Sequence, residues 1–150
     1  MKFLKTLVLA GLLLATGQIV NALAETVPGD ATAGKSMYPL CTSCHGVNGS
    51  GNQVMGAPKI SGQLEFYTLK QLQHFQNGRR GTVAGDKKGM QMAAMSKGPR
   101  LKSPEALANL AAYVSSLPDK TATSTVQGDA TKGEAAYSVC AACHGGLGEG

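Results

Sequence analysis

Two stretches of the chain carry apolar residues at the spacing of an amphipathic helix. The first is EFYTLKQLQHFQNG, residues 65–78, and its apolar positions, with Leu64 just before it, are Leu64, Tyr67, Leu69, Leu72 and Phe75. The second begins after Ser103, a good helix-capping residue, with Pro104 at the first helical position. It places Leu107, Leu110 and Val114 on one face and ends before Pro118. No run of alternating β-branched residues is found, so the pattern predicts an all-α fold.

A different hydrophobic pattern opens the chain. Lys2 and Lys5 form a positive start, residues 3–20 (FLKTLVLAGLLLATGQIV) supply a largely apolar run, and residues 22–24 read Ala-Leu-Ala. Basic residues, an apolar stretch and a small-x-small site together are typical of a secretory signal peptide. We therefore expect residues 1–24 to be removed after Ala24, with an uncleaved membrane anchor as the alternative.

The remaining composition indicates a small exported helical protein. The formal net charge of +5 includes the two leader lysines, so the mature chain would carry about +3, too little to favour a nucleic-acid partner. No later stretch is apolar for long enough to cross a bilayer.

An eighteen-residue passage occurs twice. The first passage, GDATAGKSMYPLCTSCHG, covers residues 29–46, and the second passage, GDATKGEAAYSVCAACHG, covers residues 128–145. Ten of the eighteen positions are identical at a constant offset of 99 residues. Each passage predicts a helix capped by its aspartate or its threonine. We expect Pro39 to break or kink the helix of the first passage.

All four cysteines lie in these passages, in two copies of C-x-x-C-H. Two disulfides, redox thiols or a zinc site are possible readings of four cysteines in an exported protein. The histidine that follows each pair favours covalent haem attachment, in which the two thiols bind the haem vinyl groups and the imidazole binds the iron. The sequence therefore predicts two haem c attachment sites, whose residues are Cys41, Cys44, His45, Cys140, Cys143 and His144.

A low-spin haem needs a second axial ligand. His74 and the methionines of GMQMAAM, namely Met90, Met92 and Met95, are the candidates, whereas Met55 lies too near His45 in a glycine-rich loop. A thioether is a common sixth ligand that raises the potential of a c-type haem. The sequence favours a methionine of this cluster, and Met92 above the others.

These residues resemble the class I c-type cytochromes, and within them the tandem two-haem cytochrome c-four type. The resemblance covers residues 29–117 and the first part of a second unit. It implies a small helical domain wrapped around covalently bound haem. It also implies that the first methionine of M-x-x-M, Met92, binds the iron of the first haem. Pro58 matches the proline whose carbonyl accepts the other ring N–H of the proximal histidine, here His45.

The resemblance also implies a domain organisation. Residues 25–118 would form the first cytochrome c domain, residues 119–127 a linker, and residues 128–150 the start of a second domain. The link between the ligand segment and the last helix, SKGPRLKSPEA, is longer here than is usual in the family. We expect the sequence to be part of a longer two-haem protein, although a natural short form is the alternative. The sixth ligand of the second haem is not identified.

The expected function is periplasmic electron transfer, by a protein that is either free or membrane-associated. The resemblance implies redox partner proteins, namely a membrane-bound electron donor and a terminal oxidase or reductase, and no small-molecule substrate. The alternative is a haem-containing enzyme or subunit, such as a two-haem peroxidase or the cytochrome subunit of a dehydrogenase. Between residues 77 and 89 we expect a flexible loop whose basic residues could steer an acidic partner. These basic residues are Arg79, Arg80, Lys87 and Lys88.

Overall fold

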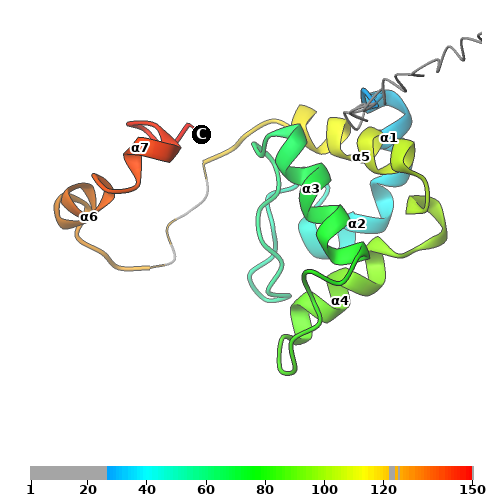
Figure 1. Cartoon of the computed structure of the whole chain (residues 1–150), viewed down its shortest axis with the longest axis horizontal. Helices are drawn as coiled ribbons and strands as arrows, with labels where there is room; N and C mark the ends of the chain where they lie inside the picture. The colour runs from blue at the N-terminus through cyan, green and yellow to red at the C-terminus, as the bar shows by residue number, and fades with distance from the viewer. Residues whose placement is uncertain (1–26, 122–123, 125, 150) are drawn as a thin grey trace, which may run out of the picture.

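The computed structural model describes residues 27–121, 124 and 126–149. The signal peptide predicted for residues 1–24 lies outside this part of the chain. The described residues form seven α-helices and one 3₁₀ turn (Figure 1). Their bounds are α1 Ala31–Met37, α2 Pro39–His45, α3 Glu65–Gln76, α4 Lys87–Ser96, η1 Pro99–Leu101, α5 Pro104–Ser116, α6 Ala130–Tyr137 and α7 Ala141–His144. The all-α prediction is therefore confirmed.

Helices α1 and α5 cross at very short range. A Cβ atom built on Gly34 would lie 1.9 Å from the backbone oxygen of Asn109, so only glycine permits this approach. The side chain of Asn109 also accepts a hydrogen bond of 2.7 Å from the backbone N–H of Asp30. Next to the crossing, the rings of Tyr38 and Tyr113 meet edge to face at 5.2 Å. The first passage is thus joined firmly to the last helix of its domain.

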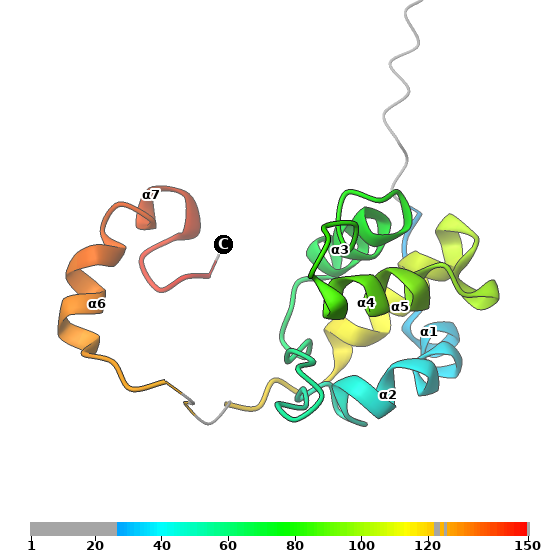
Figure 2. The same ribbon diagram turned by 90° about the horizontal axis from the view of Figure 1, so that it is seen from below.

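The core lies between α3, α5 and the start of α2. Helix α3 packs against both α5 and α4, and Figure 2 shows these three helices side by side. Leu110 is fully buried at the centre, and most of α5 is buried with it. The core cluster consists of Tyr38, Leu72, Leu101, Leu107, Leu110, Val114 and Leu117. The side chain of Gln76 anchors the segment between α4 and α5 by donating 2.7 Å hydrogen bonds to the carbonyls of Ser96 and Leu101.

The predicted helix caps are present. The carboxylate of Asp30 accepts from two backbone N–H groups at the start of α1, and Asp129 does the same for α6. Ser103 caps α5 through a 3.1 Å bond from the N–H of Ala106. In each passage aspartate, and not threonine, is the capping residue.

The helix break next to Pro39 is not caused by the proline alone, as the sequence had suggested. The first passage does break before Pro39, because α1 ends at Met37 and α2 begins at the proline. The second passage also breaks here, because α6 ends at Tyr137 and α7 begins at Ala141, yet Ser138 occupies the position of the proline. Both breaks contain the same tight turn, from the N–H of the first cysteine to the carbonyl of the tyrosine three residues before it. The break therefore belongs to the shared passage, and proline is only compatible with it.

The flexible loop expected over residues 77–89 is shorter than predicted. Helix α4 already begins at Lys87, so Lys87 and Lys88 belong to its first turn. The carboxylate of Asp86 caps this helix by accepting a 2.7 Å bond from the N–H of Gly89. The methionine cluster consequently lies on a helix, where Met92 and Met95 are one turn apart.

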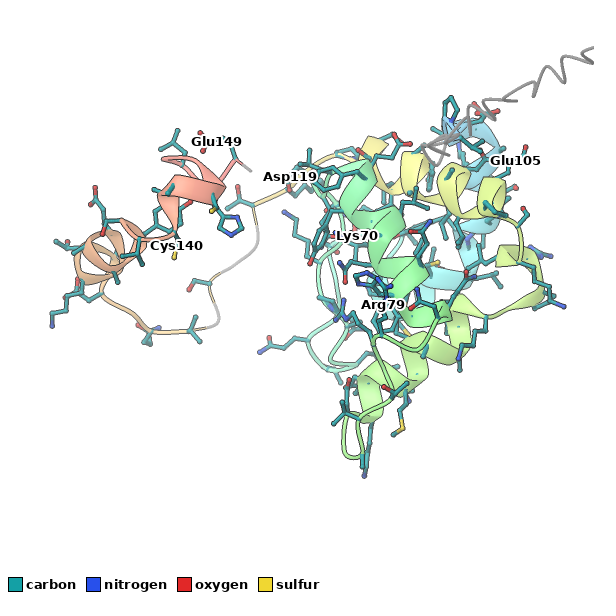
Figure 3. All side chains as sticks on the ribbon, viewed as in Figure 1. Lys70, Arg79, Glu105, Asp119, Cys140 and Glu149 are labelled. Atoms are coloured by element: carbon teal, nitrogen blue, oxygen red, sulfur yellow. The ribbon has the colours of Figure 1, made fainter. Side chains whose placement is uncertain are left out.

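Within the described ranges, none of the helices is both long enough and apolar enough to cross a membrane. Beyond α5, Asp119 pairs with Lys59 and thereby holds the departing chain against the loop that follows α2 (Figure 3). Helices α6 and α7 lie apart from the other helices in both ribbon views (Figures 1 and 2). Neither of these two helices buries any residue.

Candidate haem site

Helix α2 presents the first C-x-x-C-H motif to the interior of the domain. Cys41 packs against the core cluster, and Cys44 lies one helical turn further on. His45 ends the helix and is only 8% exposed. All three side chains line the same cavity. Gly46, with φ of +80°, then turns the chain away from the helix.

The ring of His45 is oriented by the backbone of the loop that follows. Its Nδ1 lies 2.9 Å from the carbonyl oxygen of Pro58. Because a carbonyl can only accept, Nδ1 must carry the proton of this hydrogen bond. The lone pair is therefore on Nε2, the state in which a histidine can bind a metal ion.

The loop between His45 and Pro58 is shaped by its own backbone. Asn52 and Ala57 exchange two hydrogen bonds of 2.8 and 2.9 Å and form an isolated antiparallel bridge. At Gly51 (φ +85°), a Cβ atom would lie 2.6 Å from the backbone nitrogen of Lys59. This close approach returns the chain to the histidine and explains why the carbonyl of Pro58 reaches the ring.

The cavity has a volume of about 580 Å³, within the usual range of about 300–1,000 Å³ for ligand pockets. Its walls come from the loop after α2 and from helices α2, α3, α4 and α5. Most of the lining is apolar. The apolar or sulfur-containing side chains are Cys41, Cys44, Met55, Ala57, Pro58, Ile60, Tyr67, Leu72, Phe75, Met92, Leu110 and Val114.

The structure separates the candidates for the sixth ligand by position. Met92 lines the cavity, together with His45, from a different helix. Met95 lines only a neighbouring cavity of about 90 Å³, to which Met92 also contributes. Neither Met90 nor His74 is part of the wall of these two cavities. Met55 does line the main cavity, from the loop, and is 41% exposed.

Burial also affects the acid–base chemistry of the site. Burial, with a smaller contribution from the nearby Cys44, raises the pKa of the Cys41 thiol to about 11. The free thiol is therefore neutral at pH 7. Burial likewise raises the pKa of Tyr38, whose hydroxyl donates a 2.7 Å hydrogen bond to the carbonyl of Gly46. This bond ties the helix before the motif to the turn after it.

The cavity fits a large, flat, mostly apolar group with a few polar atoms. The hydroxyl of Thr68, on α3, forms part of its lining and is buried without a hydrogen-bond partner from the protein. A buried hydroxyl is normally paired, so this atom indicates that a bound group completes the site. The same cavity is lined by two thiols, an imidazole whose Nε2 is free, and a thioether. This donor set suits a covalently attached haem.

The second C-x-x-C-H motif repeats the local hydrogen bonds of the first, but its cysteines and histidine are exposed. The hydroxyl of Tyr137 donates a 2.8 Å bond to the carbonyl of Gly145, as Tyr38 does to Gly46. Cys140, labelled in Figure 3, is exposed, and so are Cys143 and His144. The first motif therefore lines the main cavity, whereas the cysteines and the histidine of the second motif are exposed in the described part of the chain.

Sequence reasoning missed several residues of the first site. Thr68, Gln71 and Arg80 line the cavity, but none had been singled out as a binding residue there. Thr68 lies four residues before the buried Leu72, so the helical period of α3 already put it on the inner face. The hydrogen bond from Tyr38 to Gly46 was missed as well, because it depends on a turn geometry that the sequence does not reveal.

Comparison with known proteins agrees with the fold. The all-α domain, with C-x-x-C-H and Met92 around one cavity, defines a class I c-type cytochrome. The Cytochrome c family matches residues 31–118, and the chain belongs to that family. Its similarity to curated cytochromes c4 places it with the c4 type.

Three relatives illustrate this similarity. Cytochrome c4 of Azotobacter vinelandii is 37% identical over 110 residues, which cover 72% of this chain and 49% of the relative. Cytochrome c-554(548) of Halomonas halodenitrificans is 33% identical over 88 residues, covering 59% of this chain and 96% of the relative. The thiosulfate dehydrogenase electron acceptor of Thiomonas intermedia is 30% identical over 145 residues, which cover 87% of this chain and 62% of the relative. The chain thus spans only about half the length of the Azotobacter relative.

Proposed function

We propose that the protein is a periplasmic electron carrier and not an enzyme. Its membership of the cytochrome c family supports covalent haem as the cofactor. The observation that carries the proposal is the cavity itself, in which the backbone-oriented His45 and Met92 are both part of the wall. A haem bound there supplies an iron that changes between Fe(II) and Fe(III).

Each residue has a defined task in this proposal. Cys41 and Cys44 form thioether bonds that prevent loss of the cofactor. His45 provides the proximal nitrogen from Nε2, and the carbonyl of Pro58 keeps the ring oriented. Met92 provides the distal sulfur. With both His45 and Met92 bound to the iron, the protein would leave no open position for oxygen or peroxide.

The surroundings of the site favour the reduced state. Leu72, Leu110 and Val114 are buried residues of the cavity wall. An apolar environment disfavours the more charged ferric form, and a thioether ligand favours the ferrous form. Both effects raise the reduction potential, as an electron carrier at the oxidising end of a chain requires.

The second passage supports a two-haem protein. We infer that Cys140 and Cys143 attach a second haem and that His144 is its proximal ligand, as the identical motif suggests. In this organisation residues 25–118 form the first haem domain, residues 119–127 the linker, and residues 128–150 part of a second domain. Changing Cys140 and Cys143 together to serine should lower the denatured mass of the mature protein by one haem. An unchanged mass would limit the cofactor to one.

The partners are expected to be redox proteins of the cell envelope. One relative is named as an electron acceptor of thiosulfate dehydrogenase, which supports a redox protein as the electron donor of this chain, and we propose that this donor is membrane-bound. A terminal oxidase or reductase would be the acceptor. The exposed Arg79 and Lys87 near α4 could steer an acidic partner, so charge reversal there should weaken the salt dependence of the electron-transfer rate. A rate that keeps the same salt dependence would reject steering.

The spin state of the ferric protein tests the carrier against the enzyme. The two-haem peroxidase and dehydrogenase-subunit alternatives predict either a haem with an open axial position or a tightly bound catalytic chain. The carrier predicts a wholly low-spin ferric spectrum of the full-length protein, reversible one-electron reduction and no turnover of peroxide. A high-spin component accompanied by peroxide turnover would overturn the proposal.

A further inference from the structure

The mouth of the main cavity carries a small set of charged side chains. Arg80, Asp86 and Lys88 belong to the cavity lining, although most of that lining is apolar. Arg80 follows the end of α3, whereas Asp86 and Lys88 belong to the start of α4. Their immediate neighbours Arg79 and Lys87 are also exposed and basic but contribute nothing to the wall. Figure 3 shows Arg79 at the C-terminal end of α3.

Arg80 is held in a fixed position at this mouth. Its Nη1 donates a 2.6 Å hydrogen bond to Oε1 of Gln71, and its guanidinium carbon lies 4.4 Å from the centre of the Phe75 ring. Its backbone N–H donates a 3.0 Å bond to the carbonyl of His74. Among the ion pairs of the described residues, none involves Arg80. The guanidinium therefore keeps several N–H donors for a bound anion.

Lys88 reaches the mouth of the cavity from the first turn of α4. Its aliphatic carbons lie beside Gly56 in the loop after α2, where an added Cβ atom would meet them at 3.2 Å. The lysine stem thus spans from α4 to this loop, across the edge of the cavity. The one acidic member of the group, Asp86, is already engaged, because its carboxylate caps α4 through the N–H of Gly89.

We propose that Arg80 and Lys88 bind the carboxylate groups of the haem, and that Arg80 is the stronger anchor of the two. This inference rests on the proposed haem site. A haem carries two carboxylates on an otherwise apolar ring, and such anions need charged or hydrogen-bonding partners when they leave water. A guanidinium held in place by stacking and by Gln71 binds a carboxylate with little further ordering.

The arrangement also implies an effect on the iron. A positive charge close to the haem disfavours the additional positive charge that the iron carries in the ferric state. Arg80, paired with a haem carboxylate, should therefore raise the reduction potential. An ion pair in direct contact is screened less by salt than charges that are separated by solvent. The contribution of Arg80 should therefore survive at high ionic strength, whereas any contribution of Arg79 should not.

The experiment compares neighbouring arginines in the haem-loaded, full-length protein. Arg80→Gln and its matched control Arg79→Gln are titrated potentiometrically at low and at high ionic strength. Arg80→Gln should lower the midpoint potential at both ionic strengths. Arg79→Gln should change the midpoint potential little at low salt and not at all at high salt. The infrared difference spectrum between the two redox states should change in its carboxylate region for Arg80→Gln alone. Lys88→Gln and Lys87→Gln should repeat this contrast with a smaller shift.

Every outcome bears on the inference. If haem-loaded Arg80→Gln has the potential and infrared bands of the wild type, Arg80 does not bind the carboxylates and the inference is wrong. If Arg80→Gln yields no stable holoprotein, Arg80→Lys, which keeps the charge, should restore haem content and an intermediate potential. Equal failure of Arg80→Lys and Arg80→Ala would instead show a purely structural role. A wild-type protein without covalent haem would overturn the proposed function itself, which separates the two failures.

Discussion

The two copies of the repeated passage reach the same local structure in different surroundings. In both, an aspartate caps the first short helix, and the helix breaks before the first cysteine. In both, the tyrosine hydroxyl donates to the carbonyl of the glycine after the histidine, and that glycine has a positive φ, +80° at Gly46 and +75° at Gly145. These features therefore follow from the eighteen residues themselves.

The surroundings decide what each copy can do. His45 is buried and faces the carbonyl of Pro58, while His144 is exposed within the described part of the chain. The first passage packs against α5 through Gly34 and Tyr38, whereas helices α6 and α7 bury no residue. The comparison teaches that the passage encodes the attachment turn, and that residues 47–117 convert this turn into an enclosed site.

The largest difference between the copies should appear at a pair of equivalent glycines. At Gly34 a Cβ atom would collide with the backbone of Asn109, whereas at Gly133 nothing lies within 4 Å. We expect Gly34→Ala to cost about 3 kcal/mol or more of the free energy of unfolding, since α1 and α5 must separate. Gly133→Ala should instead be neutral or stabilise its helix by about 0.5–1 kcal/mol. Urea unfolding of the two variants measures both changes in the free energy of unfolding. Equal effects at Gly34 and Gly133 would contradict the claim that only the first passage is tightly packed.

A smaller difference is expected at the equivalent tyrosines. The ring of Tyr38 is buried in the core cluster, so Tyr38→Phe removes a part-buried hydrogen bond and leaves the carbonyl of Gly46 only the 3.2 Å bond from the N–H of Gly49. This should cost about 0.5–1.5 kcal/mol, measured by urea unfolding. Tyr137 makes the same bond in a helix pair that buries no residue, and Tyr137→Phe should cost less than about 0.5 kcal/mol. Similar losses of unfolding free energy in Tyr38→Phe and Tyr137→Phe would show that the surroundings do not matter to this bond, and would contradict the comparison.

The smallest effect concerns alkaline pH. Burial raises the pKa of Tyr38 above its ordinary value near 10. Because the folded state holds this proton more tightly than the unfolded state, the stability contribution is complete below about pH 10 and is lost as the pH rises through the raised pKa. The wild type should thus lose more unfolding free energy than Tyr38→Phe between about pH 9 and pH 12. Parallel curves would show that the Tyr38 proton makes no contribution.

Much of this fold could be predicted from the sequence because its signals are local. Ser103 with Pro104 marks the start of α5, and the period of Leu107, Leu110 and Val114 fixes its buried face. The adjacency of two cysteines and a histidine on one helical turn fixes the attachment motif. A helical period, a cap and a motif each depend on a few neighbouring residues, so one chain is enough to read them.

Features that depend on distant contacts could not be predicted in this way. The start of α4 at Lys87 was missed because the glycines and charges around it suggest a loop, although Asp86 was a possible cap. The place of Arg80 at the cavity mouth depends on Phe75 and Gln71 of the preceding helix. The orphaned hydroxyl of Thr68 is defined only by what surrounds it.

The central claim is that His45 and Met92 hold the iron of the first haem between them. The most direct test is the visible spectrum and midpoint potential of haem-loaded Met92→Ala, with Met95→Ala, one helical turn away, as the matched control. We predict that Met92→Ala loses the spectral features of sulfur ligation and has a lower potential, while Met95→Ala retains both. A Met92→Ala protein with the spectrum and potential of the wild type would contradict the account.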